Sequence, residues 1–427
     1  MDCYLGIDFG TSGARAIVID AETHVCAQVS QRFTDSQTQD QATTWRSLLF
    51  TLIQQLPERV RGRLRAIAIN GTSSTVLLCD SAGQPLTAPL LYNDAIGAAE
   101  LATLQELFAT QPDAPCQSNV CNATSSLVKL LWWQRQPVYA QAKYFLHQAD
   151  WLAFLLHGQL GISDYHNSLK LGYDVHRLTY PDWLMALDVS SLLPHVLPPG
   201  TPVGTIQPMI AADLGLPTDC QICTGTTDSI AAFLASGATQ SGQAVTSLGS
   251  TLVLKLLSHT AIENATYGIY SHRLGDRWLV GGASNTGGAV LQQFFTPLEL
   301  ATLSQQIPVD QPSPLDYYPL LQPGERFPIN DPNLSPRLEP QPRDRVAFLH
   351  GLLESIGRIE AQGYHLLHTL GATPLTQVYT AGGGANNPTW TVIRQRLLGV
   401  PVVSSLQTEA AYGTALLARK TQIHSSQ

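Results

Sequence analysis

Residues 6–20 read Gly-Ile-Asp-Phe-Gly-Thr-Ser-Gly-Ala-Arg-Ala-Ile-Val-Ile-Asp, which predicts two short apolar strands joined by a tight Gly-Thr-Ser-Gly turn. Asp8 ends the first strand, where the chain leaves the core. The backbone N–H groups of such a turn can point together at an anion, and its glycines let a phosphate group approach closely. A carboxylate beside the turn suits Mg²⁺, which prefers oxygen ligands and shares them with phosphates. A Gly-rich hairpin in an ordinary core has the same local pattern, so the rest of the chain has to decide between the two interpretations.

The segments that follow also alternate between apolar strands and small polar residues. Residues 3–30 predict three strands, and the apolar spacing over 41–56 predicts a helix. A buried strand over 65–70 ends in Gly-Thr-Ser-Ser-Thr, and a second strand covers 76–80. Because α/β folds place ligand groups at the carboxyl ends of strands, residues 71–75 form a candidate binding loop.

The same pattern restarts in the second half of the chain. Residues 243–254 read as a strand pair broken by Gly-Ser-Thr, which resembles the first turn. A short strand over 377–380 leads into Gly-Gly-Gly-Ala-Asn at 382–386, and a helix follows from about Pro388. Three glycines between a strand and a helix let the backbone lie against a ligand, although a flexible connection has the same composition. We therefore expect an internal duplication, with two domains of like fold that each offer one phosphate loop to a shared cleft.

Length and composition agree with two domains. At 427 residues the chain is too long for one core, and we expect domains at 1–228 and 229–427. A formal net charge of −8 without a basic block argues against a nucleic-acid partner. No uncharged apolar run is long enough to span a membrane, and no secretory signal precedes the first strand. These features predict a cytoplasmic protein without a membrane partner, and they leave its oligomeric state open.

One cysteine pair has a spacing that needs a separate interpretation. Cys220 and Cys223 stand in a CxxC pattern, which occurs in metal and redox sites. A zinc site needs four ligands, whereas Ile222 and Cys223 look like the start of a buried strand. We favour buried, reduced thiols, and a redox role for the pair stays open.

Taken in order, these segments resemble the FGGY family of carbohydrate kinases, and the resemblance runs over nearly the whole chain. No single motif is specific, but eight of them follow one another in the family's order. They are the first phosphate motif at 6–20, a K-x-x-W signature at 129–132, the catalytic-aspartate segment at 225–228, the second phosphate motif at 247–251, landmarks at 285–288 and 323–328, the adenosine motif at 382–386 and the closing helix at 408–415. The resemblance implies an α/β fold with two duplicated ribonuclease H-like domains, as in actin and Hsp70, flanking a cleft for ATP and substrate.

The resemblance also implies a role for each motif. Asp228 is the expected base that accepts the proton of a sugar hydroxyl, although it also directly precedes a helix and could cap it. Asp8 is the second catalytic residue and is expected to hold Mg²⁺ through water; a turn-stabilising aspartate is the simpler alternative. The expected ATP-binding residues are Thr11, Ser12, Gly13, Gly249, Ser250, Thr251, Gly287, Gly383, Gly384 and Asn386. The expected sugar-binding residues are Ser73, Ser74, Asn93 and Asp94, with Asp8 and Asp228 shared. Glu325 and Arg326 are a candidate ion pair, for which we favour a structural role.

The substrate is the least determined part of this prediction. Family members that use glycerol tend to carry arginine soon after the aspartate that corresponds to Asp94, and this chain reads Asp94-Ala-Ile-Gly. The chain is also short, and it looks most like the compact ketopentose kinases of cyanobacteria and plants. That similarity implies transfer of the ATP γ-phosphate to the 5-hydroxyl of D-ribulose, with D-xylulose, another pentulose or a polyol as alternatives. An ATP-switched protein of the actin or chaperone type, or an inactive regulator, is the alternative of another class. An ATP-switched protein has no need for the Gly-Thr-Thr-Asp segment at 225–228, and the presence of both Asp8 and Asp228 argues against an inactive regulator.

Overall fold

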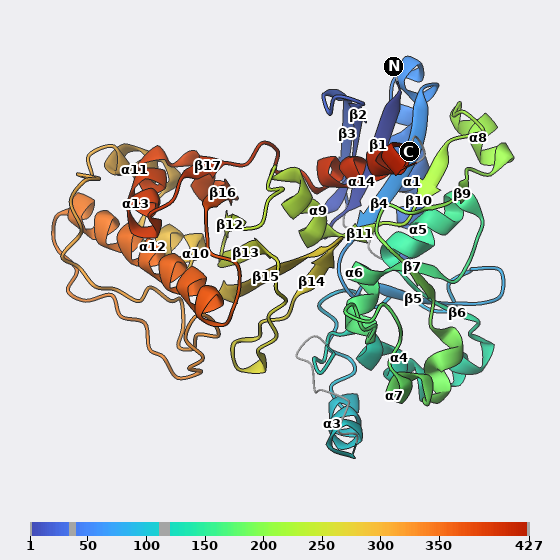
Figure 1. Cartoon of the computed structure of the whole chain (residues 1–427), viewed down its shortest axis with the longest axis horizontal. Helices are drawn as coiled ribbons and strands as arrows, with labels where there is room; N and C mark the ends of the chain where they lie inside the picture. Colours follow the sequence, from blue (N-terminus) through green and yellow to red (C-terminus); the bar gives the residue numbers. More distant parts are fainter. Residues whose placement is uncertain (1, 34–39, 111–119, 425–427) are drawn as a thin grey trace. The chain divides into compact units, whose positions relative to one another are not determined.

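The computed structural model describes residues 2–33, 40–110 and 120–424, and the chain forms two compact units (Figure 1). Unit 1 comprises Met1–Ala235 and Glu409–Gln427, and unit 2 comprises Ser236–Thr408. The chain therefore leaves unit 1 after Ala235, seven residues beyond the division that the sequence suggested at 228/229. Helix α9 (Asp228–Ala235) packs against α14 (Ala410–His424), and both pack on the first sheet, which keeps them in unit 1.

Unit 1 is built on a mixed seven-stranded sheet. β1, β2 and β3 form an antiparallel meander, and β4 and β10 then extend the sheet in parallel from β1. The order is β3-β2-β1-β4-β10-β9, with β11 also paired to β4. The strands are β1 (Cys3–Phe9), β2 (Gly13–Asp20), β3 (Val25–Arg32), β4 (Leu64–Gly71), β9 (Pro202–Thr205), β10 (Gln221–Cys223) and β11 (Thr226–Thr227). The strands predicted over 3–30 and 65–70 are confirmed.

Helices cover both faces of this sheet because its central strands are apolar on both sides. Leu5 and Ile7 of β1 face a core shared with α1, α5 and α8. Tyr4 faces a smaller core that includes alanines of α14. Gly6 lets α14 lie directly on β1, since a β-carbon there would overlap the Ala411 carbonyl oxygen. The helices of the core that contains Leu5 and Ile7 are α1 (Gln41–Gln55), α2 (Glu58–Arg61), α5 (Gln148–His157) and α8 (Pro208–Leu214).

The rest of unit 1 is a mainly helical region with its own apolar cluster. Trp133 and Phe145 are buried in this cluster. The elements are β5 (Val76–Cys79), α3 (Glu100–Thr110), α4 (Ser126–Gln134), β6 (Tyr144–His147), β7 (Ile162–Asp164), α6 (Tyr165–Ser168), α7 (Asp182–Met185) and β8 (His195–Leu197). Short 3₁₀ turns cover Pro137–Gln141, Leu169–Leu171 and Asp188–Leu192.

Unit 2 repeats the sheet of unit 1, which confirms the predicted duplication. β12, β13 and β15 are antiparallel neighbours, and β16 and β17 then extend the sheet in parallel from β12. The order is β14-β15-β13-β12-β16-β17. The strands are β12 (Gln243–Leu248), β13 (Leu252–Ser258), β14 (His272–Leu274), β15 (Arg277–Ser284), β16 (Gln377–Ala381) and β17 (Val402–Ser404). The strand pair predicted over 243–254 and the strand over 377–380 are thus present.

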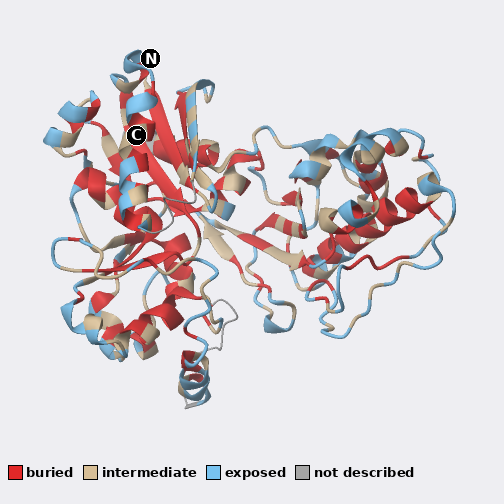
Figure 2. Cartoon of the chain, turned by 180° about the vertical axis from the view of Figure 1, so that it is seen from behind, coloured by how far each residue is buried: buried red, intermediate tan, exposed pale blue. Residues whose placement is uncertain are grey.

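The core of unit 2 includes the long helix α12, much of which is buried (Figure 2), and a buried ion pair. The guanidinium of Arg394 on α13 donates to the Glu360 carboxylate of α12 at 2.6 and 2.7 Å, and to Thr380 of β16 at 2.7 Å. Both charged side chains are buried away from water, and the charge of each is compensated by the other. The helices are α10 (Gly288–Phe294), α11 (Pro297–Ser304), α12 (Arg345–Thr369) and α13 (Pro388–Leu398), with 3₁₀ turns at Ala265–Tyr267 and Gly383–Asn386. Across the described residues, no helix has the length and apolar character needed to cross a membrane.

Candidate active site

Asp8 lies at the end of β1 among buried oxygen atoms that have no partner. The β1–β4 register pairs Asp8 with Asn70, and β11 brings Thr227 beside the next residue of β4. Asp8 Oδ1, Asn70 Oδ1 and Thr227 Oγ1 are buried without a hydrogen-bond partner in the described chain. Asn70 is itself held by α14, because its Nδ2 donates to Thr414 Oγ1 at 2.6 Å. Three unpartnered oxygens at neighbouring strand ends are a set that can accept from a hydrated cation.

The two candidate catalytic carboxylates interact within unit 1. Burial, and after it the charge of Asp228, raise the pKa of Asp8 to about 7, although the charge of Arg15 and a hydrogen bond from Asn70 act in the opposite direction. Arg15 forms an ion pair with Glu409, just before α14. A carboxylate pKa near neutrality, caused by burial and by a second carboxylate, is typical of catalytic and other functional sites.

Asp228 is the first residue of α9, and its side chain forms a hydrogen bond at the start of that helix. Its Oδ1 accepts from the Ser229 N–H at 2.7 Å, so the carboxylate satisfies one of the free N–H groups at the helix start. The residue stays partly exposed, whereas Thr226 and Thr227 before it are buried.

The first phosphate loop is a tight turn whose tip is exposed. The Gly10 N–H donates to the Gly13 carbonyl at 3.0 Å, and the Phe33 N–H donates to the Ser12 carbonyl at 3.0 Å. Thr11 and Ser12 are exposed, which leaves their hydroxyls and N–H groups accessible to a ligand. Gly13 packs against β3, where a β-carbon would overlap the Gln31 carbonyl oxygen.

Beside this loop, unit 1 contains a pocket of about 190 Å³. It is lined by Gly10, Thr11, Phe33, Gln41, Thr44, Trp45, Thr72, Leu91, Tyr92 and Gln148. Of these, Gly10 and Thr11 belong to the predicted phosphate turn and Thr72 to the predicted binding loop at 71–75. Gln41, Thr44 and Trp45 come from α1 and Gln148 from the start of α5, and the sequence analysis named none of them as binding residues. The apolar spacing of residues 41–56 identified the helix but not the polar side chains that line the pocket.

The four predicted sugar-binding residues do not line this pocket. Ser74 is buried, and its hydroxyl has no partner in the described chain. Asp94 Oδ2 accepts from the Leu91 N–H at 2.7 Å and so stabilises the loop that carries Tyr92. Ser73 is partly exposed and Asn93 is exposed. The loops named from the sequence do reach the pocket, through Thr72, Leu91 and Tyr92.

Unit 2 contains a pocket of about 540 Å³ that brings together motifs far apart in the sequence. Five of the predicted ATP-binding residues line it, namely Gly249, Ser250, Gly383, Gly384 and Asn386. Leu248, Leu291, Leu300 and Trp390 supply apolar walls. A mostly apolar pocket with a few convergent polar groups is typical of small-molecule sites. Gly384 is required for this shape, because a β-carbon there would lie 2.6 Å from Leu248 Cβ.

The other two ATP-binding residues predicted in unit 2 are Thr251 and Gly287, and both belong to loops next to this pocket. The Gly288 N–H donates to the Gly249 carbonyl at 2.9 Å, which joins the second phosphate loop to the segment that carries Gly287. Gly287 packs against that loop, since a β-carbon there would lie 2.6 Å from Thr251 Cα. Neither Thr251 nor Gly287 is among the residues that line the pocket.

Glu325 stabilises residues 284–285, which precede Gly287, through hydrogen bonds. Its carboxylate is 2% exposed and accepts from Ser284 Oγ at 2.5 Å, from the Asn285 N–H at 2.8 Å and from Tyr318 Oη at 3.1 Å. The Arg326 contribution is its backbone N–H at 2.9 Å. Glu325 therefore has the structural role favoured from the sequence, through hydrogen bonds and not through an Arg326 ion pair.

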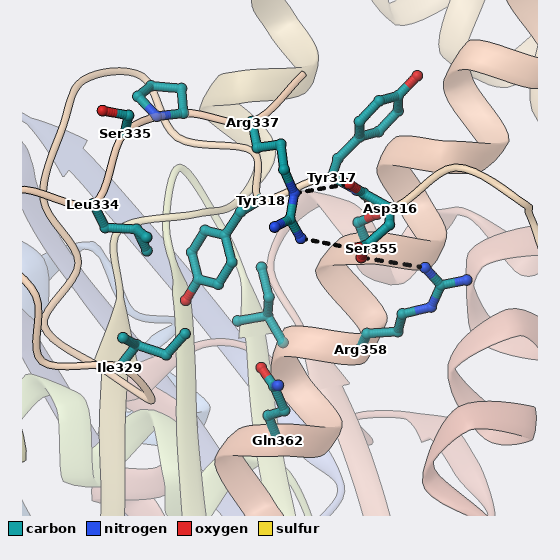
Figure 3. A pocket seen from close by; sticks show the side chains of 12 residues that line it. Asp316, Tyr317, Tyr318, Ile329, Leu334, Ser335, Arg337, Ser355, Arg358 and Gln362 are labelled. Atoms are coloured by element: carbon teal, nitrogen blue, oxygen red, sulfur yellow. Dashed lines mark hydrogen bonds and ion pairs between the residues drawn. The ribbon is translucent and has the colours of Figure 1, made fainter. Parts of the chain in front are cut away.

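A second pocket of unit 2, of about 530 Å³, is lined by α12 and by the segment around residues 316–337 (Figure 3). Arg337 and Arg358 both point toward Asp316, with a shorter N–O distance of 2.7 Å from Arg337. Arg358 also donates to the backbone carbonyls of Ser313 and Leu315. These contacts hold the segment against α12. We therefore interpret the residues around this pocket as structural and not as a ligand site.

The described residues hold no cluster of three or more histidine, cysteine or acidic side chains that could form a metal cage. Mg²⁺ does not need one, because it is commonly held by one or two carboxylates together with phosphates and water. Burial raises the pKa of Cys220 to about 12, and Cys223 beside it acts in the same direction. Both thiols lie in the core, which agrees with the buried position expected from the sequence, and a redox role for the pair stays open.

Comparison with known proteins agrees with this arrangement. The N-terminal domain model of the FGGY family of carbohydrate kinases matches residues 3–235, and the C-terminal domain model matches residues 244–421. The xylulose kinase of Escherichia coli (strain K12) is 26% identical over 91% of this chain and 83% of that protein. The autoinducer-2 kinase of Yersinia enterocolitica is 24% identical over 98% of this chain and 86% of that protein.

Solved structures show the same fold. A xyloylose kinase from Brucella ovis superimposes with a TM-score of 0.85 at 23% identity, covering 99% of this chain and 91% of that one. The xylulose kinase of Rhodospirillum rubrum gives 0.81 at 22% identity, covering 97% and 89%. The two domain models together span most of the sequence, and the chain belongs to the FGGY family of carbohydrate kinases, which transfer a phosphoryl group to a sugar hydroxyl.

Proposed function

We propose that this enzyme transfers the γ-phosphoryl group of ATP to the 5-hydroxyl of a five-carbon ketose. The observation that carries the proposal is the pair of interacting carboxylates in unit 1. Asp8 has an unpartnered, buried oxygen and a pKa raised to about 7, and Asp228 contributes to that shift from the start of α9. Phosphoryl transfer to an alcohol requires a group that takes its proton and a means of neutralising phosphate charge.

In this proposal the two aspartates have different tasks. Asp228, partly exposed, accepts the proton of the attacking hydroxyl as the new bond forms. Asp8 would hold Mg²⁺ through water, a role that fits its unpartnered Oδ1 and the unpartnered oxygens of Asn70 and Thr227. Bound Mg²⁺ would supply positive charge against the phosphates. Thr11, Ser12 and the N–H groups of their turn would orient the phosphate chain.

The pocket of unit 2 is our candidate for the adenosine part of ATP. Its apolar walls suit a base and ribose, and Asn386 supplies an amide for hydrogen bonding. Gly383 and Gly384 keep side chains out of the space beside Trp390. Gly249 and Ser250, which belong to the second phosphate motif, line the same pocket.

Two five-carbon ketoses are the leading candidate substrates. The pocket of about 190 Å³ in unit 1 has room for a small polar molecule, and Gln41, Thr44 and Gln148 offer hydrogen-bonding groups. The curated relatives named as xylulose kinases support D-xylulose. The sequence pattern favoured D-ribulose, which stays a prediction.

Coupled ADP release tests the proposal directly. Purified enzyme with Mg-ATP would be given D-xylulose, D-ribulose, L-xylulose, L-ribulose, glycerol or no sugar. Stimulation by one pentulose well above the rate without sugar is the expected result, and mass spectrometry of the product would show a pentulose phosphate. A flat response across all pentuloses, with a response to glycerol or to another polyol, would refute the pentulose assignment.

A further inference from the structure

Lys129 of α4 is a fully buried lysine whose ammonium group contacts two loops at once. Its Nζ donates to the Ser74 carbonyl at 2.8 Å and also to the Leu91 carbonyl. The side chain has no solvent exposure and is among the largest fully buried side chains described. An ammonium in that position can join two carbonyl oxygens that belong to segments 17 residues apart.

Both loops supply the wall of the pocket in unit 1. Thr72 comes from the first loop, and Leu91 and Tyr92 come from the second. Thr75 Oγ1 links them a second time, because it accepts from the Tyr92 N–H at 3.0 Å and lies 2.5 Å from Thr72 Oγ1.

Gln148 completes this network on the other side of the pocket. Its Oε1 accepts from the Thr72 N–H at 3.0 Å, and its own N–H donates to the Thr75 carbonyl at 2.9 Å. Four of the residues that line the pocket therefore belong to one hydrogen-bonded network, and Lys129 ties its two loops together. The first loop is also bent sharply, since Ser74 has a φ of +66°, a conformation that a serine rarely adopts without support.

The burial of a charge here has a cost that the contacts must offset. Burial lowers the pKa of Lys129 to about 8, and the carboxylate of Asp94 partly counteracts that shift. An apolar side chain of similar length would fill the same space without this cost. It would, however, leave the buried Ser74 carbonyl without its donor, and the Leu91 carbonyl with only the Asp94 N–H. Lys129 therefore forms hydrogen bonds to both loops in addition to filling space in the core.

We propose that Lys129 is a positioning residue for the sugar pocket, which fixes the separation of loops 72–75 and 91–94. By holding both loops, it sets where Thr72, Tyr92 and Gln148 present their polar groups to the substrate. This inference deepens the proposed pentulose kinase activity and rests on it. It distinguishes Lys129 from a lysine that only stabilises the helical region.

The test compares Lys129→Met and Thr75→Val with the parent enzyme. Thr75→Val keeps the shape of the side chain, leaves Lys129 in place and removes the hydroxyl that forms the second link between the loops. Both variants should raise the KM for the pentulose at least about tenfold, since small displacements of binding groups have large effects, while the KM for ATP changes less than about twofold. Lys143→Met, at an exposed lysine of the same region, is the matched control and should behave as the parent.

Hydrogen exchange gives a readout that does not depend on the substrate. Without ligands, amides of residues 72–75 and 91–94 should exchange faster in both variants, while amides of β1 keep their parental rates. Unchanged exchange and an unchanged pentulose KM in folded Lys129→Met would overturn the inference. Equal increases in the KM for sugar and for ATP would also overturn it, because they indicate general destabilisation. If Lys129→Met does not fold, the same criteria apply to Thr75→Val. A parent enzyme that ignores every pentulose refutes the proposed function, and the exchange data then still decide whether Lys129 holds the loops.

Discussion

Replacing Asp8 by asparagine should make the protein more stable and less active at the same time. The folded chain holds this carboxylate in a buried position and near a second carboxylate, which raises its pKa from 3.8 to about 7. At 1.36 kcal/mol for each pKa unit, keeping the group ionised above pH 7 costs about 4 kcal/mol. Asp8 is partly exposed, so screening reduces this cost, and we expect a gain of about 2 kcal/mol for Asp8→Asn.

The gain should depend on pH with a defined sign. Below about pH 4 both the folded and the unfolded chain keep the proton on Asp8, so the two proteins should be almost equally stable. Between about pH 4 and 7 only the folded chain keeps it, so the parent loses stability relative to the variant as the pH rises. Above about pH 7 the proton is lost from both states, and the difference stays constant.

Urea titration of metal-free protein at about pH 4, 6 and 8, fitted with a transition for each unit, measures this difference. Asp213→Asn, at an exposed position of α8, is the control and should show no pH-dependent gain. Turnover of Asp8→Asn with Mg-ATP should fall at least about 100-fold, the magnitude typical of a lost charge at a reacting phosphate. A variant no more stable than the parent at about pH 8, or a gain that is the same at every pH, would refute the reasoning.

Three further substitutions test other parts of the site. Asp228→Asn should lower kcat at least about 100-fold while ATP affinity stays within about twofold, measured by steady-state kinetics and nucleotide titration; a variant that keeps most of its kcat would exclude the base role. Gly384→Ala should weaken ATP binding about tenfold, because its β-carbon would lie 2.6 Å from Leu248 Cβ, and unchanged affinity would contradict the assignment of this pocket. Glu325→Gln should destabilise unit 2 by about 2 kcal/mol, since a buried carboxylate loses its charge-assisted bonds, and an unchanged thermal transition would exclude that support role.

The sequence predicted the sheets well because their signals are local. Apolar runs broken by small polar turns identify β1, β2, β12 and β13, and the repetition of that pattern predicted the duplication. The convergence of the glycine-rich segments at 249–250 and 383–384 on one pocket agrees with the motif order. In these elements, local chemistry and tertiary structure require the same residues.

The pocket of unit 1 was harder to predict, because its lining depends on tertiary packing. Trp45 belongs to the apolar face of α1, and nothing in the spacing distinguishes a core tryptophan from one that also lines a pocket. Ser74 has the right chemistry for a sugar ligand, but its positive φ accompanies a buried hydroxyl. Gln148 lies 76 residues from Thr72, so their hydrogen bond has no local signature.

The way α14 closes unit 1 has a consequence for how the protein is made. Ala411 and its neighbours cover β1, yet the ribosome adds them only after all of unit 2. At about 5–20 residues per second, the first sheet waits roughly 10–30 s for its last helix. During that time Tyr4, Ile17 and Ala68 lack the alanines of α14 that cover them in the finished unit. A nascent chain of this kind should bind chaperones until its final residues emerge, and a fragment that ends at Ala235 should aggregate.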